Sequence, residues 1–341
     1  MKNALLITLM FVALSATAQL KRTDTLRTGI TTKNNDTVAW VYNGNLNIGI
    51  NQGFLHNWAA GGEIASATIN GLFNGSLTRL YHRQVWSNNL DLTYSLFYAY
   101  SNSFIPRKMD DRIDFTSKYG YRLDTAADFY LTALFNFKSQ FTKGYDYESQ
   151  IWDTFSTSNF LSPAYFILGP GIEYRKGTAL TLFLSPAAAR LTTASLYYTS
   201  RSPEGAFGVE NGKTTRWELG AYFSGRYTVN ITENLTYRTR LDLYSNYLAK
   251  EYLDSAGNVV KENNPGNIDI LFDNLFTWKM SKYFSVALGA TFIYDNDLPY
   301  DKFEVDPTTG KEVLKDEPGT SLGWWQIKQI FTIGFQYKFN N

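Results

Sequence analysis

Residues 129–141 read FYLTALFNFKSQF, and this stretch decides the fold. Every second position is apolar or small: Phe129, Leu131, Ala133, Phe135, Phe137, Ser139 and Phe141. The positions between them are mostly polar: Tyr130, Thr132, Leu134, Asn136, Lys138 and Gln140. Because successive side chains on a strand point to opposite faces, the pattern predicts a strand with one apolar face and one mostly polar face.

The same alternation recurs along the chain, at 86–100, 112–123, 216–231, 235–247, 268–280, 283–294 and 325–339. These runs exceed the about five or six residues of an ordinary strand and match the about 9 to 11 residues of a membrane-spanning one. Aromatic residues stand near the ends of the apolar faces, as Trp217 and Tyr227 do, and Trp325 and Phe339. This arrangement is typical of the aromatic girdles of transmembrane barrels.

Twelve strands are predicted, and short connections alternate with long ones. The strands are expected at 44–53, 63–81, 84–104, 111–122, 127–143, 164–175, 178–186, 216–230, 234–249, 267–280, 283–295 and 325–339. The long connections are 144–163, 187–215, 250–266 and 296–324, and two of them contain turn sequences flanked by strand-like residues, which predicts small hairpins there. We therefore predict an all-β fold, a transmembrane up-and-down antiparallel β-barrel of 12 strands; counts of 10 or 14 also fit the pattern.

The first residues, MKNALLITLMFVALSATAQ, combine one Lys, a short apolar run and a small-residue cleavage site. This order predicts a signal peptide at 1–18, followed by a polar periplasmic lead-in at 19–43 and the barrel at 44–341. The expected location is the outer membrane, with membrane lipid as a partner. The chain has no Cys and a net charge of +1, so disulfides are excluded and the charge gives no sign of nucleic-acid binding.

Several stretches resemble a family of secreted Bacteroidota barrel proteins, the domain of unknown function 3078. They are NWAAGGE at 57–63, DDRIDFTSKYGYRL at 110–123, SNFLSPAYFILGPGIEY at 158–174, LFLSP at 182–186, GAFGVE at 205–210, LDLYSNYL at 241–248 and the ending FQYKF. The resemblance implies an outer-membrane barrel. It implies no activity, substrate or catalytic residue.

No catalytic, cofactor or metal site is predicted. Gly169-Pro170-Gly171 suggests a nucleotide loop, but a strand follows where such a loop needs a helix, so a bulge or bend is favoured. His82 is predicted at an exposed turn, with no Ser beside it on its strand face. A lipid-modifying enzyme is therefore the least favoured interpretation, because a nucleophile and its base must be close enough to hydrogen-bond.

Charged residues on the predicted inward face are the candidate lumen lining, because Arg or Lys on the lipid face would cost about 2–4 kcal/mol each at the midplane. They are Arg112, Asp114, Lys118, Lys138, Arg226, Arg238, Arg240, Asp242, Asp269, Asp273 and Lys328. A passive channel or small-solute transporter is the preferred function, with the solute unidentified. The alternative is a closed structural or assembly barrel that presents surface loops. Basic residues clustered at one height would favour an anion channel, and interleaved ion pairs would favour the closed barrel.

The stretch NWAAGGE is predicted to join the first two strands at the extracellular side. Our hypothesis is that Trp58, Gly61, Gly62 and Glu63 form a cap folded over the lumen, with Glu63 hydrogen-bonded to an inward Arg. An interface position for Trp58 in the aromatic girdle is the alternative.

Overall fold

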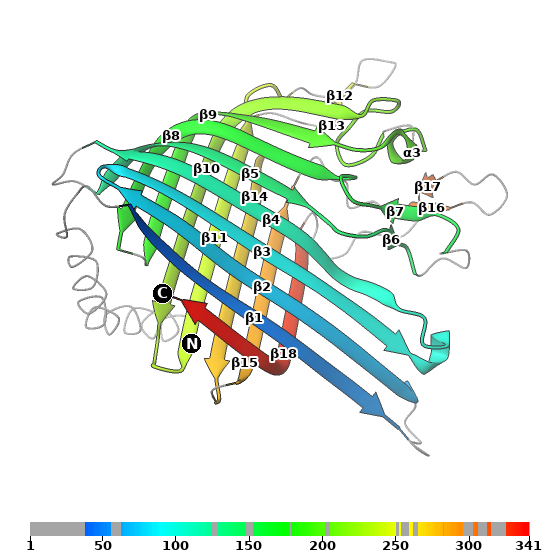
Figure 1. Ribbon diagram of the computed structural model, residues 1–341. Helices are drawn as coiled ribbons and strands as arrows, with labels where there is room; N and C mark the ends of the chain where they lie inside the picture. Colours follow the sequence, from blue (N-terminus) through cyan, green and yellow to red (C-terminus); the bar gives the residue numbers. More distant parts are fainter. Residues whose placement is uncertain are drawn as a thin grey trace, which may run out of the picture.

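The computed structural model contains a closed antiparallel barrel of twelve strands (Figure 1). The structure describes residues 38–55, 63–123, 128–147, 153–177, 179–201, 205–249, 252–253, 259–261, 265–281, 283–295, 303–305, 312–314 and 325–340. The barrel strands are β1 (Ala39–Phe54), β2 (Ala65–Tyr81), β3 (Gln84–Ala99), β4 (Arg107–Arg122), β5 (Phe129–Ser139), β8 (Ala164–Lys176), β9 (Leu180–Thr193), β10 (Thr215–Asn230), β11 (Leu235–Asn246), β14 (Ile268–Lys279), β15 (Phe284–Tyr294) and β18 (Trp325–Asn340). Each barrel strand pairs with the next barrel strand along the chain, so the predicted fold and strand count are confirmed.

The barrel closes where β1 pairs with β18. Gly49 and Gly334 are opposite each other in this seam, and a Cβ atom added at Gly334 would lie 2.1 Å from the carbonyl oxygen of Ile48. Only glycine permits the two backbones to approach so closely. The seam therefore requires glycine at residue 334, and closure leaves no unpaired strand edge in the bilayer.

Two strands differ in extent from the predicted ones. β1 begins at Ala39 rather than residue 44, inside the expected lead-in. β9 continues to Thr193, whereas the sequence pattern predicts its end at residue 186. The register shifts where Pro186 and Ala187 oppose Ala221 of β10, so a bulge accommodates the proline without ending the strand.

The same irregularity extends to β8. The pairing of β8 with β9 shifts between Leu168 and Ile172, which brackets Gly169-Pro170-Gly171. This confirms the predicted bulge or bend at these residues, because a strand continues on both sides of them.

Short turns lie at one end of the barrel and long connections at the other. His82 and Arg83 form a two-residue turn between β2 and β3, and His82 is exposed there with a positive φ of 49°. The long connections carry α3 (Leu196–Thr199), η1 (Tyr100–Asn102) and three two-stranded hairpins. These are β6 (Gly144–Tyr145) with β7 (Ser156–Ser158), β12 (Tyr252–Leu253) with β13 (Val259–Lys261), and β16 (Phe303–Val305) with β17 (Glu312–Leu314). The last two pairs confirm the hairpins predicted in the long connections.

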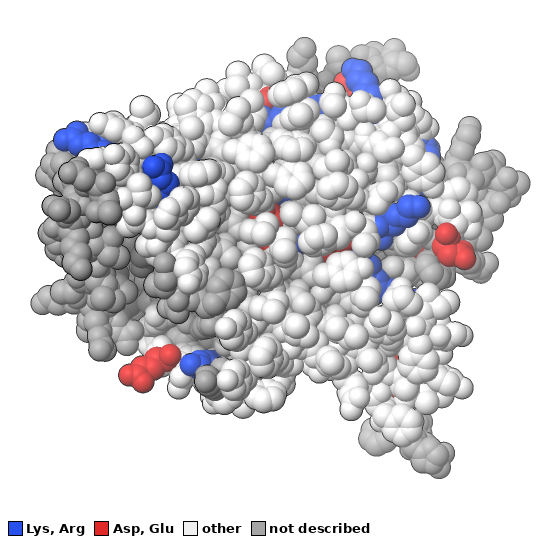
Figure 2. All heavy atoms as spheres, viewed as in Figure 1, with Lys and Arg blue, Asp and Glu red and all other residues white. Residues whose placement is uncertain are grey.

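The outer face is apolar. Large hydrophobic side chains point outward from β1, β8, β10 and β18, with exposures of 65% at Ile50, 60% at Leu168, 67% at Trp217 and 53% at Phe331. Figure 2 shows a broad uncharged surface with most Lys and Arg side chains toward its ends. A membrane-spanning barrel needs this inversion, because its lipid-facing side chains are apolar and its polar side chains face inward.

No helix among the described residues is long and apolar enough to cross a membrane.

Candidate functional site in the barrel lumen

β4 carries a row of inward polar side chains that reach across the lumen to five other strands. Alternate residues of β4 face inward, and five of them make this row: Asp110, Arg112, Asp114, Thr116 and Lys118. Their partners are Lys328 on β18 at 2.8 Å, Asp273 on β14 at 2.9 Å, Arg240 on β11 at 2.6 Å, Arg226 on β10 at 3.0 Å and Glu173 on β8 at 3.2 Å. We call these five contacts the β4 rungs. Together they divide the lumen into two parts.

The part of the lumen that lies between β4 and β11, on the side of β5, is filled by side chains. Its centre is an apolar cluster that contains Leu134, Phe183 and Tyr222, each at most 2% exposed. Buried ion pairs surround this cluster, including the carboxylate of Asp242 with Lys138 and Arg240. We call this part the filled half, since apolar side chains and paired charges occupy its interior.

The part on the β1 side contains a cavity of about 140 Å³. Apart from Lys328, the cavity-lining residues of β2, β15 and β18 are uncharged: Leu72, Asn74, Ala287, Gly289, Thr291, Ile330 and Thr332. Since one water needs roughly 10–15 Å³ of such volume, the cavity has room for several waters or one small solute. We call this part the open half, and the β4 rungs form its charged wall.

A second ion-pair cluster lies nearer the long-connection end. Arg190 of β9 donates to both carboxylate oxygens of Glu218, pairs with Asp269 and lies 4.2 Å above the ring of Tyr244. Arg216 also pairs with Glu218, at 3.0 Å. Sequence reasoning missed Arg190 because the predicted strand ended at residue 186. The alternation of Arg190 and Thr192 with apolar Ala189 and Leu191 was the available signal.

Two cations of the candidate set differ from the others. Arg226 contacts the uncharged hydroxyl of Thr116, and its Nε is buried without a partner. Arg238 makes no hydrogen bond or ion pair within the described part of the chain. Both line the cavity. The structure therefore places the candidate charges in the lumen as two groups: those paired in the network, and these two arginines.

The predicted hydrogen bond from Glu63 to an inward arginine is wrong. The other residues of the predicted loop cap, Trp58, Gly61 and Gly62, lie outside the described residues. Glu63 accepts hydrogen bonds from the backbone N and the Oγ of Ser101, at 2.8 and 2.7 Å, and not from an inward arginine. The η1 turn brings Ser101 within reach of the β2 entrance, which the strand pattern could not indicate. These bonds from Ser101 hold the pKa of the Glu63 carboxyl below its ordinary value.

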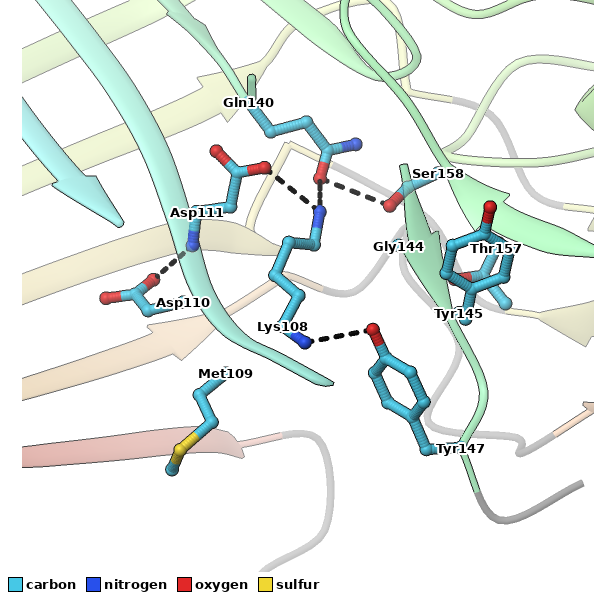
Figure 3. Close-up of a pocket in the computed structure, with 10 residues that line it drawn as sticks. All are labelled: Lys108, Met109, Asp110, Asp111, Gln140, Gly144, Tyr145, Tyr147, Thr157 and Ser158. Atoms are coloured by element: carbon cyan, nitrogen blue, oxygen red, sulfur yellow. Dashed lines mark hydrogen bonds and ion pairs between the residues drawn. The ribbon is translucent and has the colours of Figure 1, made fainter. Parts of the chain in front are cut away.

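A second cavity, of about 270 Å³, lies at the barrel rim between the start of β4 and the β6–β7 hairpin (Figure 3). Lys108 donates from Nζ to Asp111 and Gln140, and its backbone N donates to the hydroxyl of Tyr147. The register shift at Met109 separates Lys108 from Asp110. Asp110 lines both this rim pocket and the lumen cavity. The two cavities are therefore neighbours.

Within the described ranges, no group of three or more His, Cys, Asp or Glu side chains is arranged to hold a metal ion.

One protein family matches part of this chain. The family model described as a protein of unknown function (DUF3078) matches residues 50–145, which confirms the sequence resemblance over that segment. No significant match was found among curated protein sequences.

The chain is similar in structure to several barrels. The translocator domain of the autotransporter NalP from Neisseria meningitidis has a TM-score of 0.34 and 10% identity, with 96% of this chain and 97% of that chain covered. An outer-membrane channel from Pseudomonas putida has a TM-score of 0.34 and 9% identity, with 89% and 95% covered. A FadL homologue from Pseudomonas aeruginosa has a TM-score of 0.28 and 11% identity, with 89% and 88% covered. These scores are too low to support an inference, so the barrel assignment rests on the strand pairing itself.

Proposed function

We propose that the protein is a passive outer-membrane channel for small polar solutes and that the open half of the lumen is its path. The observation that carries this proposal is the lumen cavity of about 140 Å³, walled on one side mostly by uncharged residues and adjoining the rim pocket at Asp110. A solute entering at the rim pocket would reach the cavity past the Asp110–Lys328 pair. The β4 rungs set the width of the path.

The apolar outer face supports a location in membrane lipid, and the signal-peptide pattern of residues 1–18 supports export to the outer membrane. Polar inward residues support passage of polar solutes. On β1, Asn45 accepts from Gln336 at 2.7 Å and Asn47 accepts from Ser285 at 3.0 Å, so amides and hydroxyls line this wall beyond the cavity as well.

Single-channel conductance of the purified protein in a planar bilayer tests the proposal. The wild type should give discrete conductance steps. Gly289→Trp should reduce them, because Gly289 lines the cavity and a Cβ atom there meets nothing closer than 3.9 Å, so the larger side chain can enter the cavity. Ala133→Trp is the matched control, since Ala133 is exposed on the lipid-facing side of β5 and its replacement should leave the conductance unchanged.

A closed barrel that presents its long connections to a surface partner is the second candidate. The specific observation in its favour is the set of β4 rungs, which cross the lumen at successive heights from Asp110 to Lys118. Folded wild-type protein with no conductance above that of the bare bilayer would favour this candidate and refute the channel.

A further inference from the structure

Arg226 and Arg238 face the cavity from neighbouring strands near the short-turn end of the barrel. In the register of β10 with β11, Arg226 is opposite Arg240 and Thr228 is opposite Arg238. Three guanidinium groups therefore share one small area of the wall. Like charges at neighbouring positions of an antiparallel pair repel each other, so this area needs compensating negative charge.

The carboxylates near this area already have partners, and Asp91, the cavity-lining carboxylate without an ion pair in the described part of the chain, accepts a hydrogen bond from Asn74 at 2.7 Å. Asp114 and Asp242 both pair with Arg240. Glu173, deeper in the filled half, pairs with Lys118 and Arg175. Asp114 and Asp242 attract Arg226 electrostatically, but neither Arg226 nor Arg238 forms an ion pair among the described residues.

The hydrogen-bonding capacity of the two arginines is also largely unused. Arg226 donates to the hydroxyl of Thr116 through one terminal nitrogen, while its buried Nε has no partner. A guanidinium presents five donors in a planar fork that matches the oxygens of a carboxylate or phosphate. Within a cavity, such charge-assisted bonds are stronger than bonds between neutral groups.

We propose that Arg226 and Arg238 form a binding site for an oxyanion, the carboxylate or phosphate group of a small solute. This inference rests on the proposed channel function and names its solute class. The hydroxyl-bearing Thr228, which also lines the cavity, supplies a further polar group beside the site. The paired charges of the β4 rungs form the wall, and the two arginines give the path its preference for anions.

Isothermal titration of the detergent-solubilised protein tests the site without requiring conduction. Inorganic phosphate and acetate are the two probes, and the tighter binder identifies the oxyanion class. The double variant Arg226→Gln/Arg238→Gln should weaken binding of that probe by at least about tenfold, as loss of hydrogen bonds to a charged group predicts. Arg79→Gln is the matched control. Arg79 is on the face of β2 that points away from the cavity, beside Tyr81 and near the short-turn end of the barrel, where Arg226 and Arg238 also lie.

The reversal potential under a KCl gradient is the second readout. Wild type and Arg79→Gln should prefer anions, and the double variant should lose this preference. Arg226→Lys/Arg238→Lys should retain it, because the charges remain, and this variant also controls for folding. Phosphate and acetate binding that is unchanged in the double Gln variant would overturn the site even if the protein conducts. Binding by a protein that does not conduct would support the site and refute the channel.

Discussion

Replacement of one buried carboxylate in the lumen should destabilise the barrel far more than replacement of an exposed one. Glu173 is the best position for this test, since its side chain is 0% exposed and pairs with Lys118 at 3.2 Å and Arg175 at 3.0 Å. Glu173→Gln keeps the shape and removes the charge, which leaves the 4% exposed ammonium of Lys118 without its carboxylate. Breaking a buried pair in this way costs about 3–5 kcal/mol, which corresponds to a roughly 150- to 5,000-fold shift in the folding equilibrium.

Glu210→Gln is the control. Its ion pair with Lys213 is shorter, at 2.6 Å, but the two side chains are 67% and 61% exposed, so its loss should cost about 0–1 kcal/mol. The assay is urea-induced unfolding in detergent micelles, followed by tryptophan fluorescence and by the gel mobility of unheated samples in SDS.

A second substitution separates the burial of charge from other effects. Lys118→Met in the Glu173→Gln background removes the isolated cation and should recover most of the lost stability, because an apolar side chain avoids the desolvation cost. The reasoning would be refuted if Glu173→Gln and Glu210→Gln cost the same within about 1 kcal/mol. It would also be refuted if the double variant were no more stable than Glu173→Gln.

Three other predictions follow from the strands and their connections. Gly334→Ala should weaken the seam between β1 and β18 and lower the temperature at which the SDS-resistant form is lost. Gly289→Ala is the control and should not lower it, because a Cβ atom there makes ordinary contacts. Equal effects of the two variants would contradict the seam argument. Gly212 and Gly177 lie in connections at opposite ends of the barrel, and the chain has no native Cys. Of two single-cysteine variants, the one at Gly212 should react with an impermeant maleimide on intact cells and the one at Gly177 should not. The reverse pattern would invert the orientation of the barrel in the membrane. Because the pKa of Glu63 is lowered in the folded protein, its stabilising contact with η1 should be present above the ordinary carboxyl pKa and be lost only as the pH falls through the lowered value. The difference in thermal stability between wild type and Glu63→Gln should therefore shrink in acid. A difference that does not depend on pH would argue against a stabilising role for the ionised Glu63 carboxylate.

The strands, their faces and the barrel class could be predicted from the sequence because they depend on local alternation. The face of an inward charge follows from its place in the alternation, as for Lys138, which follows the apolar Phe137 and precedes the small Ser139. The sequence pattern predicts a wrong strand end where contacts with a distant strand override a local signal. Pro186 predicts the end of a strand and places Arg190 in a loop, whereas a bulge against β10 accommodates the proline and the strand continues.

Only the tertiary structure determined which charges meet and where space remains. Arg112 pairs with Asp273, which is 161 residues away, and Asp114 pairs with Arg240 across the lumen. Such partners depend on the register of every strand between them and on how the closed barrel brings opposite walls together. The division into a filled and an open half, and the two arginines without an ion pair among the described residues, have the same origin. Periodicity assigns a side chain to the inner face, whereas the distance across the barrel decides what that side chain can reach.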